Sequence, residues 1–129
     1  MAKTALVEQD IQAGAELVRR LDNAAWNVAA ALWLLDSEEA TWRLVLAAPR
    51  VHAAGHRAAY KALVPVLHSL PRERRLTVDD VVLLPPDAPL LRVLRQGIRT
   101  GPRDISPIRF SGNTINNVTF RDALIYRLA

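Results

Sequence analysis

Two histidines four residues apart, His52 and His56, are the residues whose type and spacing most suggest metal chemistry. On one turn of a helix, imidazoles at this spacing can bind the same divalent metal ion. A third ligand would have to come from another segment, and Asp79, Asp80 and His68 are the candidates. Such a site would suit a small metal-dependent hydrolase or nuclease using His52, His56 and the aspartate pair. This is the alternative function to the one favoured below.

Other catalytic templates each lack an essential residue. No serine lies in a Gly-x-Ser-x-Gly elbow, and glycines are too sparse for a phosphate-binding loop. The chain has no cysteine, which excludes disulfides, thiolate zinc sites and a cysteine nucleophile. Two surface histidines near the start of a helix are the simpler interpretation of the His52 and His56 pair. The sequence therefore predicts no catalytic residue, no metal ion and no cofactor.

Arginine is the second chemical signal. Residues 1–49 carry four basic and seven acidic side chains, a net of −3, whereas residues 50–129 carry 13 basic and six acidic side chains, a net of +7. Guanidinium groups match the geometry of phosphate, so the second half is suited to a polyanion such as nucleic acid. The candidate nucleic-acid-binding residues are Arg72, Arg74 and Arg75 in a polar connector, Arg92, Arg95 and Arg99 at helical spacing, and Arg103.

A solvated, non-functional charged face is the alternative interpretation of these arginines. Aromatic residues are few near them, which does not favour stacking on single strands. No helix-turn-helix, zinc-finger or RNA-recognition pattern is present in the chain. The opposite charges of the two halves can also neutralise each other across one fold.

The element that must position these residues is residues 28–48, where two apolar runs flank a short polar stretch, as in a β-hairpin. Pairing Leu35 with Thr41 would place Trp33 opposite Arg43, where ring and guanidinium can stack. Both faces of such a hairpin are apolar, so both must be covered. The cover is either helices of the same chain or a partner, which would be another protein or a second copy. In the second case Trp33 and Arg43 are the predicted interface residues.

Hydrophobic periodicity predicts the remaining elements. Helices are expected at 5–22, at 51–70 with a kink or break at Pro65, and at 89–98 with Gly101 closing it. Strands are expected at 76–84 and 105–110. Residues 118–128 fit either a helix or a strand, and the strand is favoured because it would pair with 105–110 and complete the sheet.

The fold class predicted is α+β: a mixed or antiparallel sheet centred on the 28–48 hairpin, with about three packed helices in a single domain, 1–129. No run of 18 apolar residues occurs, so a cytoplasmic protein without membrane contact is expected. The many arginines and alanines suggest a bacterial source. The function favoured is a small non-catalytic module that binds nucleic acid or a nucleic-acid-processing protein, through the basic half, the hairpin face or both.

Overall fold

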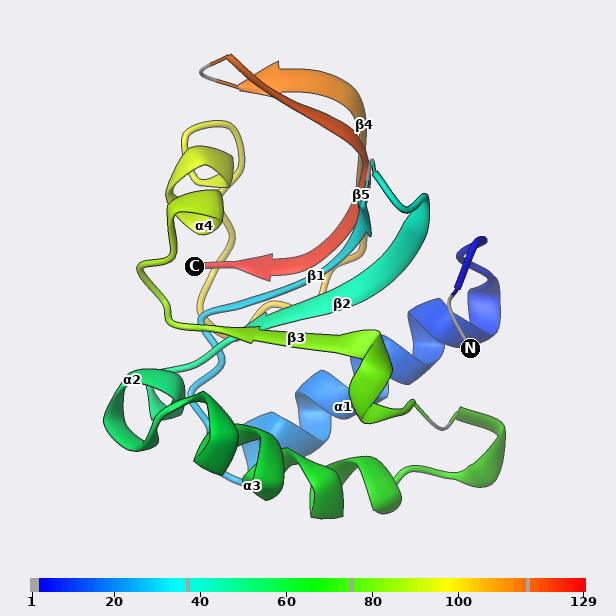
Figure 1. Ribbon diagram of the computed structural model, residues 1–129, viewed down its shortest axis with the longest axis vertical. Helices are drawn as coiled ribbons and strands as arrows, with labels where there is room; N and C mark the ends of the chain where they lie inside the picture. The colour runs from blue at the N-terminus through cyan, green and yellow to red at the C-terminus, as the bar shows by residue number, and fades with distance from the viewer. Residues whose placement is uncertain (1–2, 37, 75, 116) are drawn as a thin grey trace.

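The computed structural model describes residues 3–36, 38–74, 76–115 and 117–129 (Figure 1). Its centre is a five-stranded sheet with the strand order β3-β2-β1-β5-β4. Neighbouring strands are antiparallel except β2 and β3, which are parallel, so the sheet is mixed. The strands are β1 (Ala30–Asp36), β2 (Thr41–Ala47), β3 (Val81–Leu84), β4 (Ile108–Ile115) and β5 (Val118–Leu128). The predicted α+β class, with the 28–48 hairpin at the centre of a mixed sheet, is confirmed.

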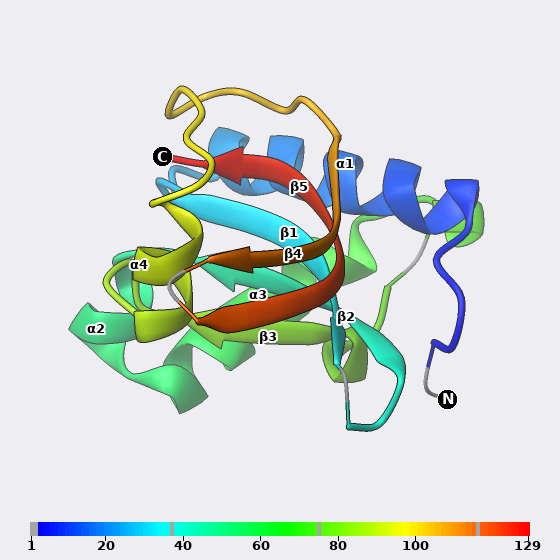
Figure 2. The same ribbon diagram turned by 90° about the horizontal axis from the view of Figure 1, so that it is seen from above.

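Helices of the same chain cover both faces of the sheet (Figures 1 and 2). The helices are α1 (Glu8–Asn23), α2 (Arg50–Ala54), α3 (His56–His68) and α4 (Pro89–Leu94). The first three lie on one face, and α4 lies alone on the concave face, where the β4–β5 hairpin curls over it (Figure 1). The first helix packs back on the hairpin, because buried residues of α1 and β2 belong to one core cluster.

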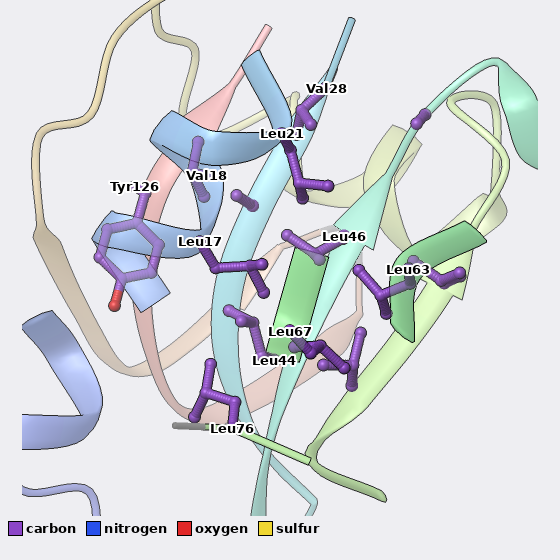
Figure 3. Packing of buried hydrophobic residues seen from close by; sticks show 14 of the residues in the cluster. Leu17, Val18, Leu21, Val28, Leu44, Leu46, Leu63, Leu67, Leu76 and Tyr126 are labelled. Atoms are coloured by element: carbon purple, nitrogen blue, oxygen red, sulfur yellow. The ribbon is translucent and has the colours of Figure 1, made fainter. Parts of the chain in front are cut away.

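The larger core lies between the sheet and the α1 and α3 layer (Figure 3). Leu17 and Leu21 of α1, Leu44 of β2, and Leu63 and Leu67 of α3 are at most 2% exposed. Burying one such side chain contributes about 1.5–3 kcal/mol relative to leaving it in water. This layer therefore provides most of the apolar burial that fixes the sheet.

The hairpin register differs by one residue from the predicted one. Asp36 pairs with Thr41, and Leu34 pairs with Arg43. The cause is the turn: Asp36 Oδ1 accepts hydrogen bonds from the backbone N–H groups of Glu38 and Glu39, at 2.9 and 3.3 Å, which extends the first strand through Asp36. The predicted Trp33–Arg43 pair is therefore wrong, although both faces are apolar as expected.

Trp33 lies in the interior, with no exposed surface. Its Nε1–H donates a hydrogen bond of 2.9 Å to the hydroxyl of Tyr126, which in turn donates one of 2.5 Å to the backbone carbonyl of Ile11. Strand β1, strand β5 and helix α1 are thus joined by one buried polar chain. Gly14 of α1 allows this close approach, because a Cβ there would lie 2.8 Å from Trp33 Nε1 and still closer to the Tyr126 hydroxyl.

Two predicted helices differ from the structure in their extent, and the favoured C-terminal strand is confirmed. Residues 51–70 form two helices, because Gly55, with a φ of 85°, separates α2 from α3. Helix α4 ends at Leu94 rather than near Ile98, since the N–H groups of Gln96 and Gly97 bond to carbonyls only three residues earlier and turn the chain. Residues 118–128 form the favoured strand.

Candidate functional site

A cleft of about 500 Å³ opens on the concave face of the sheet. Its floor is formed by outward-facing apolar residues of the first three strands, and its walls by the start of α4 and the start of β5. The lining residues are Leu34, Leu35, Asp36, Arg43, Val45, Val82, Leu84, Ala88, Pro89, Leu90, Val118, Thr119, Phe120 and Arg121. Small-molecule sites in proteins span about 300–1,000 Å³ and are mostly apolar with a few polar groups, and this cleft has both properties.

Helix α4 forms one wall of the cleft with its start and covers the neighbouring surface of the sheet. Leu91 and Leu94 are fully buried against Val45, Ile125 and other residues of the second core cluster. Beside the start of the helix, Leu34 and Val82 stay partly exposed and line the cleft.

The β4–β5 hairpin forms the other wall. It is held over the end of α4 by a close contact between Ile115 and Gly97, where a Cβ on the glycine would lie 2.7 Å from Ile115 Cδ1. Asn117, with a φ of 66°, lies between β4 and β5, a backbone conformation that asparagine tolerates well, and Asn116 lies outside the described residues. Phe110 and Phe120 pack edge to face beneath this hairpin, with ring centroids 6.1 Å apart.

Three charged groups line the cleft, and they differ in what already binds them. Arg43 donates a hydrogen bond of 2.9 Å to the carbonyl of Asp79 and lies 3.6 Å from a Glu39 carboxylate oxygen. Asp36 accepts the two backbone hydrogen bonds of the hairpin turn. Arg121 is exposed and has neither a hydrogen bond nor an ion pair within the described part of the chain. One cation at this cleft is therefore uncommitted.

The arginines predicted to bind nucleic acid do not gather on one face. Arg72 and Arg74 lie in a short 3₁₀ helix beside α1, where Arg74 donates a hydrogen bond to the Gln12 side chain at 3.1 Å. Arg75 lies outside the described residues. Arg92 belongs to α4, on the opposite face of the sheet (Figure 1). The structure thus separates the connector arginines from those of the predicted helical stripe.

The predicted helical stripe of Arg92, Arg95 and Arg99 does not form one free basic surface, because Arg95 is bound to the backbone. Arg95 donates hydrogen bonds to the backbone carbonyls of Ala129 and Pro86, at 2.7 and 2.8 Å, so its guanidinium is used in holding the chain. Burial lowers the pKa of this guanidinium, with the Arg99 charge acting in the same direction. Arg92 and Arg99 are exposed, and Arg103 is exposed beside a second hollow that Arg95 also lines.

The two predicted interface residues, Trp33 and Arg43, lie in different environments. Trp33 is covered by α1, so it presents no surface to a partner. Arg43 is partly exposed at the cleft. The alternative in which the chain's own helices cover this face of the hairpin is therefore the one that the structure supports.

Two residues of the metal hypothesis, His52 and Asp80, each have a different partner. His52 Nε2 lies 2.7 Å from Asp87 Oδ1, and this hydrogen bond lowers the pKa of the Asp87 carboxyl below its usual value. Asp80 accepts hydrogen bonds from the backbone N–H and the hydroxyl of Thr77. Within the described ranges, no three His, Cys, Asp or Glu side chains lie close enough to hold one metal ion.

Sequence reasoning missed the cleft and its free cation. Arg121 lies in a strand that the sequence favoured, but nothing in its neighbourhood distinguishes it from any surface arginine. The apolar character of the floor was detectable, because both faces of the hairpin were expected to need a cover. The predicted register, however, places Leu34 and Val45 on opposite faces, whereas the observed register brings both to the cleft.

Comparison with protein-family models, with curated proteins and with solved structures finds no match for this chain. Among the helices described, none combines the length and the apolar character needed to cross a bilayer. The function is therefore inferred from the shape and chemistry of the cleft.

Proposed function

We propose that this protein is a small non-catalytic binding module whose ligand lies in the cleft on the concave face. The observation that carries the proposal is the cleft itself: a hollow of about 500 Å³ with an apolar floor and few charged groups. An apolar surface left open to water is unfavourable, since burial is worth roughly 25 cal/mol per Å². A ligand that covers the partly exposed side chains of Leu34, Val82 and Leu84 would recover that free energy.

The positions of the candidate catalytic side chains favour binding without catalysis, because these side chains lie outside the cleft. His52 and Asp87 form an exposed pair, and Asp80 is bound to Thr77. None of these side chains lines the cleft. The groups that do line it are arginine, aspartate and threonine side chains, which can orient a ligand.

Nucleic acid stays a predicted partner on the ground of charge alone. Arg92, Arg99 and Arg103 are exposed and follow one another along the chain, which favours a contact with phosphate on the α4 side. Fluorescence anisotropy of labelled DNA and RNA across a salt series tests it. Binding that weakens steeply with salt would support this partner, and no binding at low salt would remove it.

The cleft is tested with a neutral apolar probe, the fluorophore N-phenyl-naphthylamine, followed by fluorescence and by amide chemical shifts. We expect saturable binding, with shift changes concentrated in β1, β2 and the start of β5. Val118→Trp places a large ring at the cleft, where Val118 is 41% exposed, and should abolish binding.

The matched control is Val78→Trp, because Val78 is similarly exposed, at 38%, but does not line the cleft. It should bind the probe as the unmodified protein does. Equal binding by both variants, or shift changes spread over the α1 and α3 layer, would contradict the proposed site.

A further inference from the structure

Arg121 differs from the other arginines of its sheet region in having no partner. Arg109 of β4 forms two hydrogen bonds with the carboxylate of Asp122, at 2.8 and 2.6 Å, and Arg127 of β5 is bound inside the protein. Arg43, across the cleft, is held by the carbonyl of Asp79. Arg121 alone among these four has its guanidinium available, with no bonded partner in the described ranges.

The surroundings of Arg121 limit the charge of a ligand. Asp36 lines the same cleft, so the three charged side chains there, Arg43, Arg121 and Asp36, sum to one positive charge. A polyanion would bring further negative charge next to the Asp36 carboxylate, which is repulsive. A single anionic group bound by Arg121 matches the charge of the cleft.

The residues of the cleft floor determine the polarity of the remaining part of the ligand. Leu34, Val45, Val82, Leu84 and Phe120 present hydrocarbon to the cleft. No unpaired buried side-chain polar atom lies among the lining residues described: the one such atom in the described part of the chain is Thr41 Oγ1, which is not in the cleft. The body of the ligand must therefore be apolar, because polar groups on this floor would lose their hydrogen bonds to water.

Resting on the proposed function, we propose that the ligand is a small amphipathic molecule with an apolar body and one carboxylate, and that Arg121 binds the carboxylate. A guanidinium and a carboxylate form two parallel hydrogen bonds when neither is otherwise engaged. The apolar body lies on the floor between α4 and β5. Arg121 is thus the residue that sets the preference for an anion.

The test measures displacement of N-phenyl-naphthylamine by octanoate and by octanol, two probes of similar length that differ in charge. In Arg121→Gln, we expect the dissociation constant of octanoate to rise about tenfold, equivalent to about 1.4 kcal/mol, because the charge-assisted hydrogen bonds of the guanidinium are lost. The dissociation constant of octanol should stay within about twofold, since no charge contacts it.

Arg72→Gln is the matched control, because Arg72 is also exposed but lies in the α1 layer on the other side of the sheet. It should leave the affinity for both probes unchanged. Equal loss of octanoate binding in Arg72→Gln and Arg121→Gln would overturn the assignment, as would a loss found only in Arg43→Gln.

The two proposals fail in different ways. If the neutral fluorophore binds and Val118→Trp blocks it, but octanoate binds no more weakly to Arg121→Gln, the cleft is a binding site and the carboxylate assignment is wrong. If the neutral fluorophore does not bind at all, the proposed function itself is wrong. A thermal melt of each variant checks that the substitution leaves the fold intact.

Discussion

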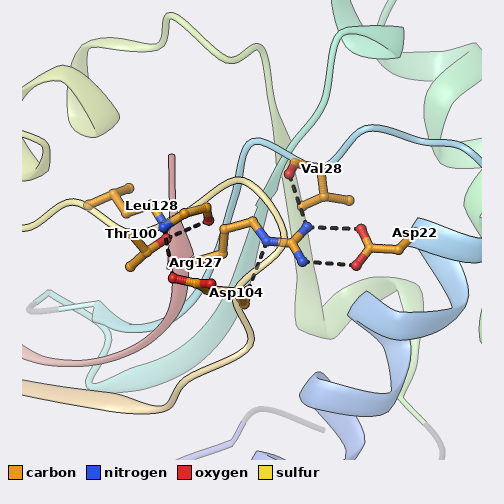
Figure 4. A network of polar contacts seen from close by, with 7 residues as sticks. Asp22, Val28, Thr100, Asp104, Arg127 and Leu128 are labelled. Carbon is orange, nitrogen blue, oxygen red and sulfur yellow. Dashed lines mark hydrogen bonds and ion pairs between the residues drawn. The ribbon is translucent and has the colours of Figure 1, made fainter.

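Arg127 and Asp22, 105 residues apart in the chain, form two parallel hydrogen bonds between guanidinium and carboxylate, at 2.9 and 2.8 Å (Figure 4). Arg127 is 1% exposed, and it also donates to the backbone carbonyls of Asp104 and Val28, at 2.9 and 3.1 Å. The pair joins the last strand to the end of α1 and to the segment before β4. A buried arginine is tolerated here because each of its three nitrogens has an acceptor.

Breaking this pair from the carboxylate side should be costly. Asp22→Ala leaves the Arg127 charge buried without a counter-charge, and removal of one partner of a buried pair costs about 3–5 kcal/mol. We expect the free energy of unfolding in urea to fall by that amount. Arg19→Gln on the same helix is the control, because Arg19 is 55% exposed and its ion pair with Glu16 is long, at 3.4 Å. A surface pair of this kind contributes less than about 1 kcal/mol. Similar losses in both variants would contradict the structural role of Arg127.

Replacing Gly14 with alanine should change the stability of the fold in the direction opposite to that usual for a helix. In an exposed helix, Gly→Ala stabilises by about 1 kcal/mol. At position 14, however, the new methyl group would overlap the Tyr126 hydroxyl and lie 2.8 Å from Trp33 Nε1. We therefore expect Gly14→Ala to lower the free energy of unfolding by about 1–3 kcal/mol, the usual cost of overpacking.

The cause of that loss can be separated with a double-mutant cycle. Tyr126→Phe removes the hydroxyl that the alanine would overlap, so Gly14→Ala should cost less in this background than alone. A stability gain in Gly14→Ala, or the same loss in both backgrounds, would show that α1 does not pack this closely on β5.

Trp33 is expected to act through the core. Trp33→Ala removes a side chain with no exposed surface and should cost about 3–5 kcal/mol of unfolding free energy, without changing the oligomeric state. Trp33→Phe keeps an aromatic ring in the core but removes the donor to the Tyr126 hydroxyl, so its cost in unfolding free energy should be smaller than that of Trp33→Ala. Chemical denaturation and size-exclusion chromatography measure the two effects. A change in association at unchanged stability would return Trp33 to the interface role predicted from the sequence.

Structural features that follow from hydrophobic periodicity could be predicted from the sequence. Features that depend on the hydrogen bonds of a single side chain could not. The apolar runs of the hairpin and the helical stripe of α1 could be found because burial repeats along them. The register could not, since it depends on the Asp36 side chain bonding to its own turn. The ion pair of Arg127 could not be predicted either, because a strand pattern cannot show that Asp22 lies opposite.

The cleft failed prediction for a different reason. Its shape depends on the curl of β4 and β5 over α4 and on where α4 begins, which are tertiary features. The arginines of the predicted stripe do follow one another at the predicted positions, but Arg95 donates to the backbone carbonyls of Pro86 and Ala129, nine and 34 residues away in the chain. Charge patterns therefore located basic residues without showing which of them are free.

Acid should weaken the fold partly through Asp122. Two hydrogen bonds from Arg109 lower the pKa of the Asp122 carboxyl below its ordinary value of 3.8, with a further contribution from Ser111. A carboxyl with a lowered folded-state pKa contributes stability above the unfolded value, and that contribution is lost as the pH falls through the folded value. The contribution of Asp122 should therefore be complete well above pH 3.8 and should disappear below it.

Urea unfolding across this pH range measures the effect in Asp122→Asn. The variant should be less stable than the unmodified protein at neutral pH, and the difference should shrink as the pH falls below 3.8. Asp79→Asn is the control, because the Asp79 side chain is exposed and forms no ion pair with the described residues. Its effect on the free energy of unfolding at neutral pH should be small. A stability difference for Asp122→Asn that is the same at neutral and acidic pH would show that Arg109 does not hold this carboxylate in its charged form.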